Sequence, residues 1–328
     1  MEDGFAQELK LPTIQGHASM NLSRPKLLIT MGDCAGIGPE IIAKAWPELG
    51  EYCQPVVIGD AARVPAGIDC FNASTADLSR VRIGKISAEA GRAAYDWLCF
   101  AIDECLAGRA DGIVTCPLHK EGLHAAGVEF PGHTEILAHR TGATSHAMLL
   151  YDDELPLAVA HVTLHQSVRS AVGAITLESV LDKIRLLHAI VPQLTGQAAR
   201  IGVAALNPHA GDGGLFGDEE ARIIAPAVER AKAVGIDATG PIASDAIFLP
   251  HNRAKFNGIA AMLHDHGHIA MKLIGGRRAV NVTAGLSIVR TSVAHGTAYD
   301  IAGQGIADES SLIAATKVAA RLAKRGIP

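Results

Sequence analysis

The sequence predicts an α/β protein built of two α/β/α lobes that share a cleft. Short aliphatic runs alternate along the chain with longer stretches of helical period that are rich in Ala, Leu and charged residues. Aromatic residues make up only 4% of the chain although 48% of it is hydrophobic, so small and aliphatic side chains dominate. Such alternation is typical of parallel sheets covered by helices on both faces. The 328 residues are enough for two modest lobes, each with its own core.

The expected strands are the aliphatic runs, each too short for a helix and bounded by polar or Gly/Pro residues. Buried parallel strands are apolar throughout and do not alternate between apolar and polar positions. The runs that meet this description are 27–31, 55–58, 112–115, 157–162, 199–206 and 258–263.

The expected helices are the longer periodic stretches, and two of them carry clear start signals. Pro39 and Glu40 place a proline and an acid in a first helical turn. Thr176 precedes a long periodic run, and Pro192 near the end of that run indicates a stop or a kink. We expect helices at 37–49, 88–107, 134–141, 177–194, 218–234 and 310–324.

Composition excludes several classes of function. The net charge is −5 and the chain has no long Lys/Arg run, so we expect no nucleic-acid partner. Its apolar runs fall short of the ~18 residues of a membrane span, and its polar start lacks the apolar core of a signal peptide. Residues 1–24 are polar and aperiodic, which predicts a flexible arm. Six cysteines without a CxxC pair favour free thiols in a cytoplasmic protein.

Three histidine-bearing segments follow predicted strands and indicate a metal site. They are 160–165, 207–214 and 263–268, and ligands bind beyond the carboxyl ends of strands in open α/β sheets. Three imidazoles from three strand ends would suit a divalent metal with an open position. In the last segment His264 is the favoured ligand. If that segment is extended, His268 lies on the same side but outside the metal's ligands or at the surface.

Two loop-to-helix junctions offer backbone amides to an anion. The glycine-rich stretch 32–40 is either an anion-binding turn or a plain strand-to-helix turn, and it matches neither the dinucleotide nor the P-loop fingerprint. In 131–135, Thr134 suits a helix N-cap, and His133 would project beside free backbone amides that could bind an anion. The alternative is that this segment only caps the helix and binds no ligand. Lys272, Asn281 and Arg290 recur at nine-residue intervals; the lysine and the arginine offer charge to an anionic substrate.

Taken together, these motifs resemble those of the 4-hydroxythreonine-4-phosphate dehydrogenase family. The resemblance spans about residues 26–320. It rests on motifs that occur in family order: the glycine-rich opening, 131–135, 207–214, His264-Asp265, Lys272, Asn281-Val282-Thr283, Arg290-Thr291-Ser292 and His295-Gly296-Thr297-Ala298.

The resemblance implies lobes like those of isocitrate and isopropylmalate dehydrogenases, with residues 25–135 plus 295–328 in the first and 136–294 in the second. It also implies a homodimer whose active site both subunits complete. NAD or NADP would bind in the interlobe cleft by a non-Rossmann mode, through residues that the sequence does not identify. The remaining assignments are metal ligation (Zn, Mg, Mn or Co) by His165, His209 and His264, substrate contacts from His133, Thr134, Lys272, Asn281 and Arg290, and a catalytic role for Lys272 and Asp245.

The resemblance implies a metal-dependent NAD(P) dehydrogenase that oxidises, and then decarboxylates, an anionic β-hydroxy acid such as 4-hydroxythreonine-4-phosphate. The chain departs from the pyridoxine-pathway pattern at Cys34 and His266, and His268 resembles paralogues acting on phosphorylated sugar acids. Residues 161–169 are closer to dehydrogenases of the terephthalate 1,2-cis-dihydrodiol, which is the alternative substrate. A non-catalytic phosphometabolite-binding protein is the alternative from another class.

Overall fold

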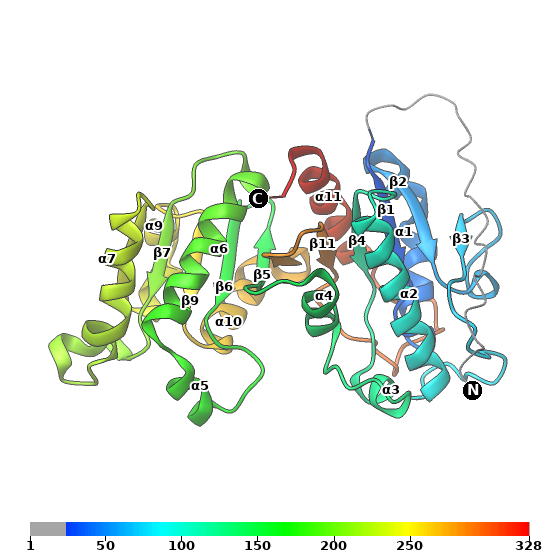
Figure 1. Cartoon of the computed structure of the whole chain (residues 1–328), viewed down its shortest axis with the longest axis horizontal. Helices are drawn as coiled ribbons and strands as arrows, with labels where there is room; N and C mark the ends of the chain where they lie inside the picture. The colour runs from blue at the N-terminus through cyan, green and yellow to red at the C-terminus, as the bar shows by residue number, and fades with distance from the viewer. Residues whose placement is uncertain (1–23, 328) are drawn as a thin grey trace, which may run out of the picture.

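The structure, a computed structural model, describes residues 24–327 as two lobes joined by a continuous sheet (Figure 1). The predicted arm at 1–24 lies outside the described residues except for Arg24. The sheet has eleven strands in the order β3-β2-β1-β4-β11-β10-β5-β6-β9-β7-β8. The strands are β1 Lys26–Thr30, β2 Gln54–Ile58, β3 Cys70–Phe71, β4 Gly112–Thr115, β5 Ala147–Asp152, β6 Leu157–His161, β7 Ile201–Ala204, β8 Ala238–Ile242, β9 Gly258–Ala261, β10 Val280–Ala284 and β11 Arg290–Ser292.

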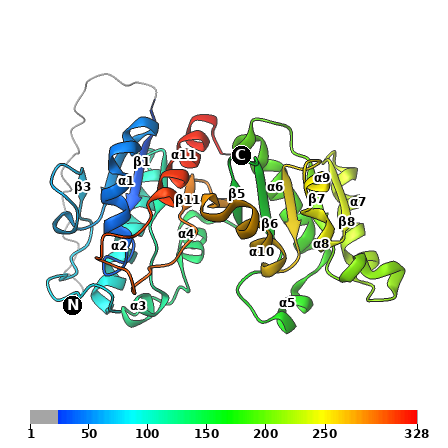
Figure 2. The same cartoon turned by 180° about the vertical axis from the view of Figure 1, so that it is seen from behind.

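Helices cover both faces of the sheet, as the two opposite views show (Figures 1 and 2). In the first lobe α2 packs on one face and α1 and α11 on the other; in the second, α6 and α7 lie opposite α8, α9 and α10. The helices are α1 Gly38–Tyr52, α2 Ala88–Leu106, α3 Lys120–Ala125, α4 His133–Thr141, α5 Val168–Ala174, α6 Leu177–Thr195, α7 Ala225–Ala233, α8 Ser244–Ile247, α9 Pro250–Arg253, α10 His264–Gly275 and α11 Ser310–Arg325.

The predicted α/β class is confirmed, but the expectation of purely parallel sheets is wrong. β5 pairs antiparallel with both β6 and β10, and β10 pairs antiparallel with β11. β5 follows α4, and β6 follows it after a short turn, so the chain reverses direction where the lobes meet. Because all six residues of β5 are buried, its sequence shows no alternation that would distinguish it from a parallel strand.

A single main core extends through both lobes, and α11 lies across their junction. α11 packs against α1, β4 and β11, and also against α6 of the second lobe. Trp97 and Tyr151 are the largest of its fully buried side chains. We keep the lobe boundaries given above as a proposal, since β11 pairs with strands of both lobes.

Some helices begin where the sequence predicted, and others do not. α6 begins after Thr176 as predicted, and Thr176 forms a capping box with Ser179 there. Thr134 is not an N-cap, because α4 begins at His133 after Gly132. The helix expected over 218–234 begins as a π-helical turn, Glu220–Ile224, before α7. The segment after β9 is helical and not extended, so His264 and His268 lie one turn apart on α10.

The glycine-rich opening at 32–40 is a strand-to-helix turn packed against other backbone. A Cβ on Gly32 would lie 2.2 Å from the Pro117 oxygen, and one on Gly38 would lie 2.1 Å from the Met31 oxygen. These glycines therefore allow close approach of backbone segments. The plain strand-to-helix turn, the second of the two alternatives given for 32–40, is enough to explain them. Within residues 24–327 no helix is long and apolar enough to cross a bilayer.

Candidate active site

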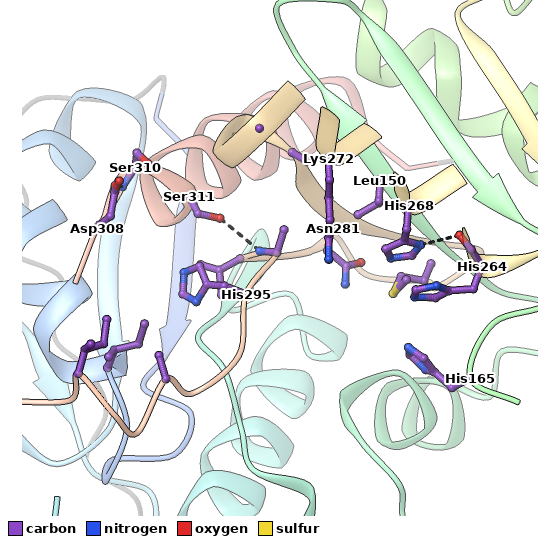
Figure 3. Close-up of a pocket in the computed structure, with 18 of the residues that line it drawn as sticks. Leu150, His165, His264, His268, Lys272, Asn281, His295, Asp308, Ser310 and Ser311 are labelled. Carbon is purple, nitrogen blue, oxygen red and sulfur yellow. Dashed lines mark hydrogen bonds between the residues drawn. The ribbon is translucent and has the colours of Figure 1, made fainter. Parts of the chain in front are cut away.

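Two adjoining chambers form a cleft where the lobes meet. The larger, about 720 Å³, and the smaller, about 370 Å³, have five lining residues in common, so they are parts of one cleft. β5, β10 and α10 form one wall, and the segment after β11 with the start of α11 forms the other (Figure 3). The five shared residues are Met148, His165, Asn281, Val293 and His295.

A cluster of histidines occupies one end of the larger chamber. His264 is the first residue of α10, and its ring stacks on that of His268 one turn later, with centroids 3.8 Å apart. His268 Nδ1 lies 3.1 Å from Nε2 of His161, the last residue of β6. His165, in the loop after β6, brings its ring centroid to 5.9 Å from that of His264. Figure 3 shows His165 and His264 facing the same part of the cleft.

Burial keeps the inner histidines uncharged. Burial, together with the neighbouring His268, lowers the pKa of His161 to about 3, and burial with His264 lowers that of His268 to about 4. Burial also lowers the pKa of His165, and Lys120 adds to that effect. At neutral pH these rings therefore present lone pairs, which is the form that binds metal ions.

The spacing of His165 and His264 fits two ligands of one ion. With a Zn–N distance of about 2.1 Å, two imidazoles on a single ion have centroids roughly 5–6.5 Å apart. Yet within residues 24–327 of one chain, no group of three His, Cys, Asp or Glu side chains is placed to hold a metal. His209 is exposed and does not line either chamber. One chain therefore offers two of the three predicted ligands at the cleft.

The smaller chamber is built around a buried arginine. Arg290, at the start of β11, is 2% exposed and donates hydrogen bonds to Thr283 Oγ1 (3.0 Å) and Thr115 Oγ1 (2.7 Å). Its Nε is buried without a hydrogen-bond partner. Burial lowers the pKa of Arg290 to about 10, although Glu135 acts in the opposite direction, so the guanidinium remains charged at neutral pH.

The groups around Arg290 make this chamber suited to an anion. Burial and the nearby Arg290 lower the pKa of His133 well below its ordinary range. His133 and Thr134 begin α4, Lys120 begins α3, and all three line the chamber, so the N-terminal turn of α4 lies at it. A buried guanidinium held only by two hydroxyl groups is stabilised further by an oxyanion of a ligand.

Asn281 lies where the chambers meet. It projects from β10, lines both chambers, and its Oδ1 is buried without a hydrogen-bond partner. Figure 3 places its amide between His295 and His268. Lys272, two turns after His264 on α10, lines the larger chamber and is exposed. An unpaired amide oxygen at this place suits a donor group on a bound molecule.

Seven of the nine predicted site residues line this cleft, and two do not. Asp245, on α8, is exposed and, like His209, lies outside both chambers. The residues that do line it are His133, Thr134, His165, His264, Lys272, Asn281 and Arg290.

Sequence reasoning assigned no role to two residues that the structure places at the cleft, and it left the place of a third, His268, open. Lys120 and His295 had no role in the sequence interpretation, although His295 belongs to a motif quoted for the resemblance. His268 is buried against His264, not at the surface, because the segment is helical. The i, i+4 spacing of His264 and His268 was the signal that could have shown this.

The fold and the cleft define a two-lobed α/β protein with a small-molecule site between its lobes. The family model for "Pyridoxal phosphate biosynthetic protein PdxA" matches residues 51–319, and the chain belongs to this family. It is 44% identical over 320 residues to a 4-hydroxythreonine-4-phosphate dehydrogenase of Beijerinckia indica, covering 90% of this chain and 94% of that one. It is 41% identical over 330 residues to the D-threonate 4-phosphate dehydrogenase of Cupriavidus necator, covering 92% and 98%.

Solved structures agree with this assignment. A 4-hydroxythreonine-4-phosphate dehydrogenase from Klebsiella pneumoniae superimposes with a TM-score of 0.82 at 37% identity, covering 91% of this chain and 99% of that one. A terephthalate 1,2-cis-dihydrodiol dehydrogenase from Burkholderia xenovorans LB400 gives 0.64 at 29% identity, covering 91% and 98%. A β-decarboxylating dehydrogenase from Thermococcus kodakarensis gives 0.52 at 15% identity, covering 89% and 81%, and shares the fold, which confirms the predicted architecture.

Proposed function

We propose that this protein is a metal-dependent NAD(P) dehydrogenase that oxidises the CH–OH group of a phosphorylated β-hydroxy acid and then decarboxylates the product. The observation that carries the proposal is the juxtaposition in one cleft of a buried arginine with the histidine pair His165 and His264. The relatives named for 4-hydroxythreonine-4-phosphate and D-threonate 4-phosphate indicate a short 4-phosphorylated hydroxy acid as substrate.

The smaller chamber would hold the anionic end of the substrate. Arg290 and the amides at the start of α4 suit phosphate oxygens, with His133 and Thr134 as hydrogen-bonding partners. Asn281 would then receive a donor group of the substrate at the junction of the chambers. Lys272, on the larger chamber, would bind the carboxylate or relay a proton to the product.

The metal would be held by His165 and His264 from one chain and by His209 from a second copy. When bound, the divalent ion supplies the Lewis acidity that favours the substrate alkoxide and the enolate left by decarboxylation. The distance between the first two rings suits the ion, and since no group of three such side chains is placed to hold a metal within residues 24–327 of one chain, we assign the third ligand to a second copy. Asp245, on the exposed α8, would reach the site from the same second copy.

We propose a homodimer in which each active site is shared. The two helices that follow the His165 loop and begin at His264, α5 and α10, each carry a pair of exposed apolar side chains at i, i+4 spacing. Such a pair is unusual on a helix face that is open to solvent. On α5 they are Val168, 70% exposed, and Val172; on α10 they are Ile269 and Leu273, the latter 82% exposed. A second copy covering these residues would also bring its own loops to the cleft.

The nicotinamide cofactor would occupy the part of the larger chamber away from the histidines. That part is lined by Ile37, Ala298, Ile301 and Ile306, which offer an apolar surface, and by Ser310 and Ser311 at the start of α11. The volume of the larger chamber exceeds what a four-carbon substrate needs. Because other backbone segments occupy the space beside the glycines at 32–40, these glycines leave no room there for a pyrophosphate. We therefore propose a cofactor-binding mode that differs from the Rossmann type. We also propose a cytoplasmic location.

A substrate panel tests the proposal against its two alternatives. NAD(P) reduction is measured with 4-hydroxythreonine-4-phosphate, D-threonate 4-phosphate and the terephthalate cis-dihydrodiol, with and without added Zn, Mn, Co or Mg. Turnover of a phosphorylated acid that needs both cofactor and metal supports the proposal. Turnover of the dihydrodiol alone would support the ring substrate, which the segment 161–169 and the 29% identical structure favour. Binding of phosphorylated acids without turnover would support a non-catalytic binding protein.

A further inference from the structure

The loop that carries His209 has a backbone conformation that L-amino acids seldom adopt. His209, Ala210 and Asp212 have φ values of 53°, 56° and 48°, and Gly211 and Gly213 between and after them are also positive. Non-glycine residues held in this region carry backbone strain. A consecutive left-handed run of this kind persists only if the surrounding structure imposes it.

Glu220 imposes it through a buried carboxylate. Glu220 is only 6% exposed, and its Oε1 accepts hydrogen bonds from the backbone N–H groups of Leu206 (2.8 Å) and Asn207 (2.7 Å). Oε2 accepts from the side-chain amide of Asn207 at 2.9 Å. Burial acts to raise the pKa of Glu220, but these hydrogen bonds outweigh it and the pKa is lowered, so the group is a carboxylate at neutral pH.

The same carboxylate also contacts the far side of the loop. A Cβ on Gly211 would lie 2.8 Å from Glu220 Oε2, so the loop backbone and the carboxylate are in close approach there. Glu220 thus contacts the chain both before and after His209. It stands at the start of a single π-helical turn, a rare geometry that occurs frequently at functional sites.

We infer that Glu220 is a positioning residue, which holds the loop 206–211 in the conformation that presents His209 to the metal in the cleft of a second copy. The inference rests on the proposed function, because it requires His209 to act in the partner's site. Groups that orient a metal ligand without touching the ion typically change metal affinity by about 10–100-fold when replaced. Glu220 would do so through the backbone of the ligand's own loop.

The first test measures cobalt binding to the chelator-treated full chain, by the visible absorption of Co(II). In Glu220→Gln one carboxylate oxygen becomes an NH₂ group that cannot accept, so a loop hydrogen bond is lost. We expect the Co(II) Kd to rise about 10–100-fold.

Glu219→Gln is the matched control. Glu219 accepts a hydrogen bond from the Asn207 side chain at 2.7 Å but is more exposed than Glu220, so the Co(II) Kd of this variant should stay within about threefold of that of the unmodified chain. An unchanged Kd in Glu220→Gln would overturn the inference. If that variant does not fold, Asn207→Ala must give the same rise; it removes the side-chain bonds to Glu220 Oε2 and Glu219 Oε2 and keeps the backbone bonds to Glu220 Oε1.

A second test separates positioning from a general loss of stability. A 1:1 random mixture of Glu220→Gln and His165→Ala chains should regain about a quarter of the activity, because about half of the dimers are mixed and one of the two sites in each carries neither change. Mixed dimers of Glu220→Gln and His209→Ala should regain none, because both changes affect the same contributed loop. Recovery in this second mixture would overturn the inference. If His165→Ala and His209→Ala fail to complement each other, the shared site itself is wrong, and the cobalt affinity still judges Glu220.

Discussion

Replacing Arg290 should weaken substrate binding while leaving cofactor binding unchanged. The guanidinium is buried, charged at neutral pH, and held only by the hydroxyl groups of Thr115 and Thr283. An oxyanion that binds it in the smaller chamber gains charge-assisted hydrogen bonds, which contribute about 1.5–3 kcal/mol. At about 1.4 kcal/mol per decade, Arg290→Met should raise the substrate KM by roughly 10- to 150-fold.

A second variant shows whether geometry or charge matters. Arg290→Lys keeps the positive charge but loses the planar fork that can grip two oxyanion atoms, so its effect should fall between the unmodified chain and Arg290→Met. Because replacing the guanidinium removes the donor to Thr115 and Thr283, the melting temperature of each ligand-free variant is measured as well, to detect a folding defect. These variants are compared by steady-state kinetics in which each reactant is varied in turn. A large rise in the NAD(P) KM with an unchanged substrate KM would show that Arg290 serves the cofactor.

Three further predictions concern the histidine end of the cleft. His165→Ala or His264→Ala should abolish Co(II) binding and turnover, and full activity after exhaustive chelation would contradict the metal proposal. Gly267→Ala should destabilise the protein by about 1–3 kcal/mol in urea unfolding, because its Cβ would lie 2.3 Å from His161 Nε2. Gly173→Ala, in a helix with open space around it, should be neutral or stabilising. The folded pKa of His161, about 3, lies below its unfolded value, so its contribution to stability is present above pH ~6.5 and is lost as the pH falls toward 3. Melting temperatures of metal-free protein should therefore fall less steeply between pH 6.5 and 4 in His161→Gln, and parallel curves would refute this assignment.

Features that depend on neighbouring residues were predicted well from the sequence. The strand 112–115 and the start of α6 at Thr176 agree with the structure because an apolar run and a capping box act within a few residues. The cleft residues of the C-terminal half were also found, since Lys272 and Arg290 are cations in otherwise apolar surroundings. The histidines were identified by type and by their place after predicted strands.

What depends on pairing between distant segments could not be predicted in this way. The antiparallel direction of β5 and β10 is a property of which strands meet, and a strand buried on both faces, such as β5, carries no mark of direction. α10 begins at His264 without a side-chain cap, so the i, i+4 spacing was the one local sign that His264 and His268 would stack.

The membership of the site itself was decided by tertiary structure. The sequence alone determined an α/β chain with histidines after its predicted strands and two cations, Lys272 and Arg290, in the segment that follows His264. The fold brought His165 and His264 to one cleft and left His209 and Asp245 outside it. It also buried Arg290 between two threonines from different strands. Residue type and spacing specify what chemistry a side chain can do, whereas its partners are set by the order in which the strands pair, and that order is a property of the whole chain.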